Sequence, residues 1–429
     1  MSATSRTTRT GRTGRTGRRR TSLVALALGS SIALAACGGG GFEDDSADEP
    51  ASSGDGPAEL QVLIASSGDA ETKAVEDAAN AWAEESGNEV EVVVANDIGQ
   101  QLSQGFAGGN PPDVFYVDAS VFGDYAEAGN LYPYMDQLEG ADDFYPNLVD
   151  TFTLDDQAYC APKDFSTLAL EINTASWKKA GLTDADIPTT WDELSDVAQK
   201  LTTPDQAGLV LGIGRDRVGA FLVQNGGWWV DADSGEATAT EPSNVEALEY
   251  VQGLLKDGSA VLAPDVDAGW GGEGFGTEKA AMTIEGNWIR GAMENDYPDV
   301  DYTVAELPEG PAGKGTLLFT QCYGIAADSP NQEAAVSLVE ALTTPEQQLK
   351  NADAFGVMPS RESAQADYVD QFPEDAPFIA GGDYGQGPVN LPGLGPVVAD
   401  LDSQLEQLKT ADVTGILESF QKNADAELQ

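Results

Sequence analysis

Short apolar runs alternate with amphipathic stretches along the chain. Residues 60–65 form an almost continuous apolar run, which predicts a buried strand, and residues 90–94 form a second, valine-rich run. Between them, apolar residues recur at the spacing of one helix face: Val75, Ala78, Ala79 and Trp82. A strand, a helix and a strand in this order predict a βαβ unit, with parallel strands and a right-handed crossover.

The same alternation continues toward the C-terminus. Further strands are predicted at 114–117, 168–172, 281–284 and 302–305. Thr190 and Thr344 each precede a Glu or Gln by three residues, which predicts a helix start. Ser329, followed by Pro330, is predicted to cap another helix, and residues 401–428 are expected to be helical. The pattern favours an α/β protein in two lobes.

The N-terminus has a different pattern from the rest. An Arg/Thr/Gly repeat ends at Arg20 and precedes an apolar run of about 14 residues, too short to span a bilayer comfortably. We therefore interpret 1–36 as a secretory signal peptide. Leu34 to Cys37 resembles a bacterial lipobox, so Cys37 is the expected lipidation site. The alternative is an ordinary signal peptide with an incidental cysteine, and Arg19-Arg20 leaves twin-arginine export open.

Residues 37–58 follow the apolar run and are rich in Gly, Ser, Pro and acid. This composition is typical of a flexible tether. The lipidated protein would then be held at the outer side of the membrane through its lipid anchor alone, with no transmembrane helix.

Charge and composition exclude several functions. The chain has 72 acidic and 22 basic residues, a net charge of -50, and no histidine. The absence of histidine excludes Ser-His-Asp and Cys-His hydrolases and histidine-ligated zinc sites. The negative charge disfavours nucleic acid, which binds mainly through Lys and Arg. Residues 231–236 resemble part of a calcium loop but lack its full spacing, so a β-turn is expected there, with no metal and no cofactor.

Two cysteines remain if Cys37 is lipidated. Cys160 and Cys322 would lie in an oxidising, exported setting, where an even number of cysteines favours a disulfide. Two buried free thiols are the alternative.

Seven short motifs occur in the order of a known family. They are Leu170–Asn173, Trp177–Leu182, Pro188–Leu194, Gly226–Val230, Glu278–Trp288, Gly324–Asn331 and Gly356–Arg361. Together they resemble the family 1 extracellular solute-binding proteins, the maltose- and multiple-sugar-binding components of ABC importers. The resemblance covers about residues 59–429.

The resemblance implies a type II periplasmic-binding-protein fold with hinge strands between two lobes. One lobe would comprise 59–162 plus 320–355, and the other 163–319 plus 356–429. Cys160 and Cys322 would then lie on neighbouring hinge strands, which supports the disulfide. The implied function is that of a monomeric, extracytoplasmic receptor, not an enzyme. It would close over a disaccharide or oligosaccharide and deliver it to the importer's membrane subunits.

Candidate ligand-binding residues follow from the chemistry of sugars. Aromatic rings pack on the apolar face of a sugar, and carboxylates, amides and lysine bind its hydroxyls. Trp288, beside Asn287 and Glu285, stands where family members place an aromatic residue against the sugar. The remaining candidates are Trp228 or Trp229, Trp270, Ser66, Ser67, Asp69, Asp118, Lys163, Asp164 and Tyr323. Helix capping by the serines and pairing of Lys163 with Asp164 are the alternatives.

Three other functions remain open at this stage. The ligand could be a non-sugar polar solute, such as a polyamine or an iron chelate. A glycosidase would need two carboxyl groups at a defined separation across the cleft. A structural surface protein would leave the cleft motifs without a purpose.

Overall fold

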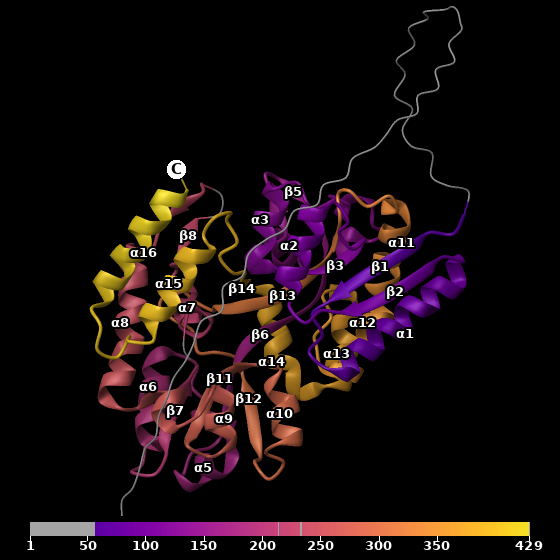
Figure 1. The fold of residues 1–429 in the computed structure, drawn as a ribbon. Coiled ribbons are helices and arrows are strands. Elements are labelled where there is room, and N and C mark those ends of the chain that lie inside the picture. The colour runs from indigo at the N-terminus through magenta and orange to yellow at the C-terminus, as the bar shows by residue number, and fades with distance from the viewer. Residues whose placement is uncertain (1–55, 213, 232–233, 429) are drawn as a thin grey trace, which may run out of the picture. The chain divides into compact units, whose positions relative to one another are not determined.

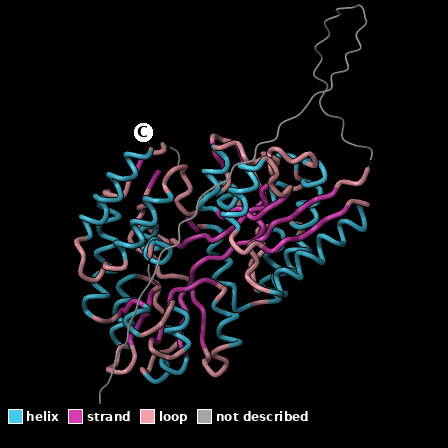
Figure 2. Tube along the Cα trace, viewed as in Figure 1, coloured by secondary structure: helices cyan, strands magenta, loops and turns pink. Residues whose placement is uncertain are grey.

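One ten-stranded sheet runs through the protein in the order β10-β7-β11-β6-β13-β3-β1-β2, with β12 beside β6 and β14 beside β13 (Figures 1 and 2). The computed structural model describes residues 56–428, except 213, 232 and 233. The strands are β1 (Glu59–Ile64), β2 (Glu89–Val94), β3 (Val114–Asp118), β4 (Thr153–Leu154), β5 (Gln157–Ala158), β6 (Ala161–Asn173), β7 (Ala207–Leu211), β8 (Val230–Asp231), β9 (Glu236–Ala237), β10 (Ala260–Leu262), β11 (Ala280–Gly286), β12 (Tyr302–Ala305), β13 (Thr316–Ile325) and β14 (Gly385–Gln386).

Helices cover the sheet and connect its strands. They are α1 (Asp69–Ser86), α2 (Ile98–Gly108), α3 (Ala119–Glu127), α4 (Pro146–Thr151), α5 (Thr174–Lys179), α6 (Trp191–Leu201), α7 (Arg215–Gln224), α8 (Pro242–Asp257), α9 (Gly271–Gly276), α10 (Ile289–Asn295), α11 (Gln332–Leu342), α12 (Pro345–Phe355), α13 (Gln365–Gln371), α14 (Ala376–Ala380), α15 (Gly395–Leu405) and α16 (Val413–Glu427). Among the described residues, no helix is both long and apolar enough to cross a bilayer.

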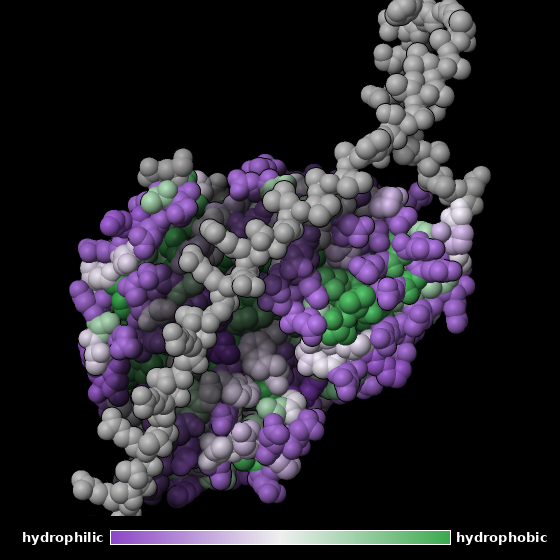
Figure 3. Space-filling model, in the orientation of Figure 1, coloured by the Kyte–Doolittle hydropathy of each residue, from purple (hydrophilic) through white to green (hydrophobic). Residues whose placement is uncertain are grey.

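The predicted βαβ unit is confirmed. Strand β1 pairs in parallel with β2 and β3, and α1 and α2 connect these strands along the chain. β2 is the edge strand, and its Glu89 and Glu91 are exposed, which protects the open edge from pairing with other chains. Hydrophilic side chains cover most of the face in Figure 3, but an apolar patch lies over β1 and β2, where Val94 is exposed.

Two long antiparallel strands, β6 and β13, join the two halves of the sheet. β13 pairs with β3 on one side and with β6 on the other, while β6 continues to β11 and β12. Buried apolar side chains at 60–161 and 322–342 form one core, here called the first core. Those at 168–317 and 389–424 form another, the second core. This is the predicted two-lobed α/β fold, although the predicted lobe boundaries stay a prediction.

Most of the predicted helix starts are confirmed. The Thr190 side chain accepts from the Glu193 N–H, and the Thr344 side chain accepts from the Gln347 N–H, so both threonines are N-caps. The prediction for Ser329 is wrong, because α11 begins at Gln332 after Asn331. The Ser329 hydroxyl instead donates to Asp113 at 2.6 Å and fastens this turn to the segment before β3.

Two smaller predictions have mixed outcomes. The expected helix over 401–428 is two helices, α15 and α16, with a break between Leu405 and Val413. Strands β8 and β9 pair in antiparallel fashion on either side of the turn predicted at 231–236. The signal peptide, Cys37 and nearly all of the tether lie outside the described residues.

The predicted disulfide is present between the long strands. Cys160 precedes β6, Cys322 lies in β13, and their Cα atoms are 5.7 Å apart. The register of the two strands shifts between Gln321 and Cys322, where Pro162 stands opposite Cys322. Proline has no N–H to donate to the neighbouring strand. The covalent link therefore joins the strands where their hydrogen bonding is irregular.

We predict that replacing both cysteines, Cys160→Ala with Cys322→Ala, lowers the free energy of unfolding by about 2–5 kcal/mol, because the bridge closes a long loop in the unfolded chain. Denaturant unfolding in the presence and absence of reductant measures this effect. Reductant should destabilise the wild type to the level of the double variant and leave the variant unchanged. Equal stability of the oxidised wild type and the variant would contradict the prediction.

Candidate functional site

A cavity of about 480 Å³ lies where β6 and β13 pass between the first and second cores. Ser67 and Asp118 line it from the first core's side. Arg215, Trp228 and Trp288 line it from the side of the second core. The middle parts of β6 and β13 and the segment after α12 complete the lining. Both halves of the protein therefore contribute side chains to one site.

Trp288 is the most prominent apolar group of the cavity. It is the second residue after β11 and is 37% exposed, although large aromatic side chains are usually buried. Its ring contacts Phe319 edge-on, with ring centroids 5.1 Å apart. A Cβ atom on Gly286 would lie 2.2 Å from the ring, so the absence of a side chain there lets Trp288 fold back over the strand end.

Charged side chains contact Trp288. The Arg217 guanidinium lies 5.3 Å from the Trp288 ring centroid, and the indole N–H donates to Glu285 at 3.1 Å. Arg217 also forms an ion pair with the fully buried Glu285. The backbone N–H of Glu285 donates to buried Glu171 at 3.1 Å. Burial is the main cause that raises the pKa of Glu171, and repulsion from Glu285 raises it further, so the neutral form is favoured.

The opposite wall is built on helix starts. Asp118 is the N-cap of α3 and accepts from the Ser120 N–H at 2.9 Å. Ser67 lies between β1 and α1, and its backbone N–H donates to Glu71 at 2.7 Å. These polar groups follow the carboxyl ends of parallel strands, where ligands of α/β sheets bind.

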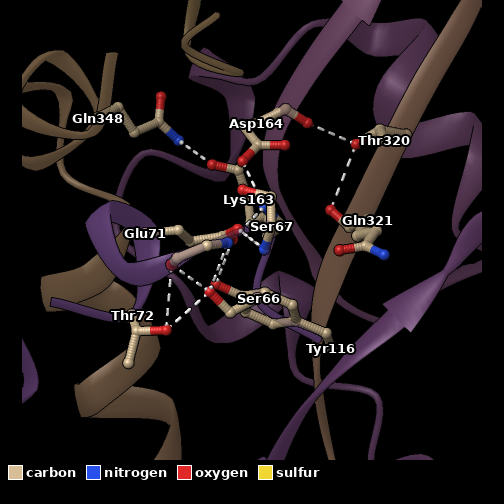
Figure 4. A network of polar contacts seen from close by, with 11 residues as sticks. Ser66, Ser67, Glu71, Thr72, Tyr116, Lys163, Asp164, Thr320, Gln321 and Gln348 are labelled. Carbon is tan, nitrogen blue, oxygen red and sulfur yellow. Dashed lines mark hydrogen bonds and ion pairs between the residues drawn. The ribbon is translucent and has the colours of Figure 1, made fainter. Parts of the chain in front are cut away.

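A buried lysine connects this wall to β6 (Figure 4). Lys163 forms ion pairs with Glu71, at 3.2 Å, and with Asp164, at 2.5 Å. Its ammonium also lies 4.7 Å from the centroid of the Tyr116 ring, and the Tyr116 hydroxyl donates to Glu71. Ser67 and Asp164 line the cavity, so Glu71 and Lys163 hold two cavity groups without lining it themselves.

The lysine shifts the pKa values of its partners. Burial alone would raise the pKa of Glu71, but the Lys163 ammonium and the Ser67 hydrogen bond hold it below the ordinary value. Burial raises the pKa of Asp164, and Lys163 only partly offsets this. Burial would also lower the pKa of Lys163, yet the two carboxylates raise it, so the lysine stays charged.

Six of the predicted site residues line the cavity: Ser67, Asp118, Asp164, Trp228, Asn287 and Trp288. Glu285 and Lys163 do not line it, but each contacts a residue that does: Glu285 contacts Trp288, and Lys163 contacts Asp164. Ser66 and Asp69 lie at the start of α1, where the Ser66 hydroxyl donates to Gly68 O and accepts from the Thr72 hydroxyl. The N-cap of α1 is Gly68, without a side-chain cap, so capping by the serines is not confirmed.

Three predicted aromatic residues do not line the cavity. Trp229 is fully buried against Phe420 in the second core. Tyr323 is 2% exposed and packs against Tyr116. Trp270 packs against a third apolar cluster and folds over Gly272. Each ring packs against the protein's own side chains or backbone, away from the cavity.

Sequence reasoning missed several residues of the lining, chiefly Arg215, Asp216, Phe319, Gln321, Phe355 and Gln386. Arg215 and Asp216 could have been found, because they follow β7, a strand whose carboxyl end faces the same region. Arg215 forms an ion pair with Asp402, which is far away in the sequence. Among the described residues, no group of His, Cys, Asp or Glu is arranged to hold a metal ion.

The Glu71 contacts give a testable pH dependence. We expect Glu71→Gln to lower the free energy of unfolding by about 1–3 kcal/mol at neutral pH, because it removes hydrogen bonds to a charged group. The pKa of Glu71 is lower in the folded chain, so its contribution is present above the unfolded-state value and disappears as the pH falls through the folded-state pKa. Denaturant unfolding of both proteins at about pH 7 and well below pH 4.5 measures the difference.

Glu76→Gln is the matched control, because Glu76 is an exposed glutamate of the same helix. It should change the free energy of unfolding by less than about 0.5 kcal/mol at either pH. A Glu71 effect of the same size at both pH values would contradict the prediction.

Related proteins share this fold. A maltotriose-binding protein of Pyrococcus abyssi is 25% identical over 362 residues, which cover 78% of this chain and 75% of that protein. A putative binding protein of Brucella abortus is 25% identical over 310 residues, covering 68% of this chain and 72% of the relative. The solved sugar-binding protein of Xanthomonas citri has a TM-score of 0.76 at 18% identity, covering 86% and 97% of the two chains.

A substrate-binding protein of Listeria monocytogenes, solved in complex with cycloalternan, has a TM-score of 0.73 at 22% identity and covers 86% of this chain and 98% of its own. These likenesses confirm the two-lobed fold. Residues 65–349 match the family described as bacterial extracellular solute-binding protein. The match covers well over half of the sequence, so this chain belongs to the bacterial extracellular solute-binding proteins.

Proposed function

We propose that this protein is an extracellular carbohydrate receptor, which binds a disaccharide or oligosaccharide and delivers it to an ABC importer. The observation that carries the proposal is the exposed ring of Trp288, held in place at the wall of the cavity between the two cores. A sugar presents both an apolar face of C–H groups and a rim of hydroxyls, and this cavity offers a partner for each.

The aromatic part of the site is preorganised. Phe319, Arg217 and Glu285 contact Trp288 on its ring or its indole N–H, so little side-chain freedom is lost when a ligand stacks on the ring. Asn287 is also fixed, because its side-chain amide donates to Gly356 O at 2.7 Å. Carboxylates and amides around the ring, including Asp118, Asp164 and Gln321, supply hydrogen-bond partners for hydroxyls.

The function is binding followed by closure of the cleft, without catalysis. Ligand that contacts both walls favours the closed form, and it shifts the equilibrium only by its additional contacts in that form. β6 and β13 would act as the hinge, with the lobes divided near residues 162, 320 and 355. We propose that the closed receptor acts as a monomer and is recognised by the importer's membrane subunits.

One observation favours a different ligand. Asp118, Asp164 and Asp216 all line the cavity, with Arg215 as the lining cation. A cationic solute such as a polyamine would be attracted to such a lining. The Trp288 ring can accept the C–H face of a sugar or an ammonium group, and the sugars named for the similar proteins favour the sugar.

A thermal-shift screen of the purified protein tests the ligand class. We expect one class of mono-, di- or oligosaccharide to raise the melting temperature, because ligand at a hundred times its Kd stabilises the folded state by about 2.7 kcal/mol. Trp288→Ala should then weaken the binding of that sugar at least about tenfold, or about 1.4 kcal/mol, as measured by calorimetry.

Trp270→Ala is the matched control, since it also removes a tryptophan but one outside the cavity lining. It should keep the affinity of the wild type. Stabilisation by spermidine or an iron chelate, with none by any sugar, would replace the carbohydrate by a non-sugar solute.

We also propose that Cys37 carries a lipid that anchors the protein at the outer side of the membrane. Cys37→Ala should then move the protein from the membrane fraction to the medium or the soluble fraction, detected by immunoblotting after fractionation. Ser30→Ala, in the same apolar run, should stay with the membrane. Retention of the Cys37 variant at the membrane would refute the anchor.

A further inference from the structure

Two completely buried glutamates, Glu171 and Glu285, lie next to each other in the sheet. Glu171 belongs to β6 and Glu285 to β11, which pair in antiparallel fashion, and the Glu285 backbone N–H donates to the Glu171 carboxyl group at 3.1 Å. Neither residue lines the cavity, and the proposed function gives Glu171 no contact with the ligand. Burying a carboxylate is costly unless an opposite charge or hydrogen bonds compensate for the lost water.

The charges around Glu171 do not balance if both glutamates are ionised. Among the described residues, the titratable groups that face Glu171 are Glu285 of β11, Arg217 of α7 and Tyr302 of β12. Helix α9 also packs against β11, but its one charged side chain, Glu273, accepts from a backbone N–H before this helix. Burial raises the pKa of Tyr302 to about 12, so its hydroxyl stays neutral. Two carboxylates would therefore share the single Arg217 guanidinium.

The contacts of the two glutamates decide which of them keeps a proton. Glu285 forms the ion pair with Arg217 and accepts from the Trp288 indole N–H at 3.1 Å. Glu171 has no ion pair among the described residues, and one oxygen of its carboxyl group is buried there without a hydrogen-bond partner. When two carboxyl groups share one site, the less stabilised carboxylate takes up a proton. Burial, and less strongly the nearby Glu285, raise the pKa of Glu171 in agreement with this assignment.

Arg217 connects the buried glutamates to the cavity. Its guanidinium lies 5.3 Å from the centroid of the Trp288 ring and 5.9 Å from that of the Phe319 ring. Its Nε–H is buried without a hydrogen-bond partner among the described residues, so a second carboxylate could bind it. An ionised Glu171 would compete with Glu285 for the guanidinium, because opposite charges attract strongly where water is excluded. This competition would draw Arg217 away from the two rings.

We infer that Glu171 holds a proton in the folded protein and acts as a positioning residue for Trp288. Its neutral carboxyl group leaves Arg217 paired with Glu285 alone, and this pair holds the Trp288 ring at the cavity wall. The inference rests on the proposed function, because Glu171 acts through the ring that is proposed to contact the ligand. It gives two buried glutamates opposite charge states: Glu71 is ionised beside a lysine, and Glu171 is neutral beside another glutamate.

Glu171→Gln tests the proton, because it replaces a protonated carboxyl group by a neutral amide of nearly the same shape. In the unfolded chain Glu171 ionises above its ordinary pKa of 4.5, whereas the folded chain keeps the proton. Unfolding of the wild type then releases one proton, so its stability falls as the pH rises. The unfolding constant of the wild type, divided by that of Glu171→Gln, should rise about tenfold per pH unit between about pH 5.5 and about pH 7.5, as measured by denaturant unfolding.

Glu71→Gln is the matched control, since it makes the same change at a buried glutamate whose pKa is lowered in the folded chain. Glu71 is ionised in both states over this pH range, so the corresponding ratio should stay constant within about twofold. A ratio for Glu171→Gln that does not change with pH would overturn the inference, because Glu171 would then be ionised in the folded chain. Failure of Glu171→Gln to fold at neutral pH would also overturn it, since the neutral amide should replace the protonated acid.

The fluorescence of Trp288 tests the positioning. Its contribution is the difference in emission between a protein and the same protein with Trp288→Phe. Glu171→Gln should leave this contribution unchanged at neutral pH, whereas Glu285→Gln, which removes the carboxylate that pairs with Arg217, should shift it. Equal shifts in both variants, or no shift in Glu285→Gln, would overturn the inference. Neither measurement uses a sugar, so these outcomes leave the proposed function to be decided by the sugar screen.

Discussion

The pairing of β6 with β13 is the interaction on which the rest of the structure depends. These strands carry the sheet from the first core to the second, and the cavity lies along them. They pair between Ala161 and Thr167 of β6 and between Leu318 and Tyr323 of β13. Cys160 and Cys322 join them covalently beside the irregularity in their register. The connection between the lobes is therefore continuous and keeps the two walls aligned, and the proposed closure of the cleft would bend these strands.

A buried charge network shares this location. Lys163 is 7% exposed and lies between Glu71 of α1 and Asp164 of β6. Desolvating three charged groups is costly, and replacing such networks by apolar residues is often neutral or stabilising. Stability alone therefore does not account for this network. It does hold two groups that line the cavity, because the Ser67 N–H donates to Glu71 and the Asp164 carboxylate pairs with Lys163.

Much of the fold could be predicted from the sequence, since buried strands and capped helices leave local signals. The threonine caps at Thr190 and Thr344 and the βαβ unit are of this kind. Local sequence could not decide which of Trp228 and Trp229 lines the cavity, because Trp229 packs on Phe420, nearly two hundred residues further along the chain. Arg215 could have been found from its place after β7, although its partner Asp402 is 187 positions away. Six of the predicted site residues line the cavity. Of those that do not, Trp229 and Tyr323 pack on residues far away in the sequence, whereas Ser66 and Trp270 contact residues close by.

The first core is built from segments that lie far apart in the sequence, and this affects when the core can form during synthesis of the chain. That core begins at Leu60 but includes side chains between Cys322 and Leu342, and β13 separates β3 from β6. A chain that is synthesised from its N-terminus cannot complete this core until roughly three quarters of it has been made. Until then β1 and β3 are exposed apolar strands without their full partners, and such species are prone to aggregate. The late segment thus closes a unit that the early segment began, so the final folding of the first core has to wait for the synthesis of residues 322–342.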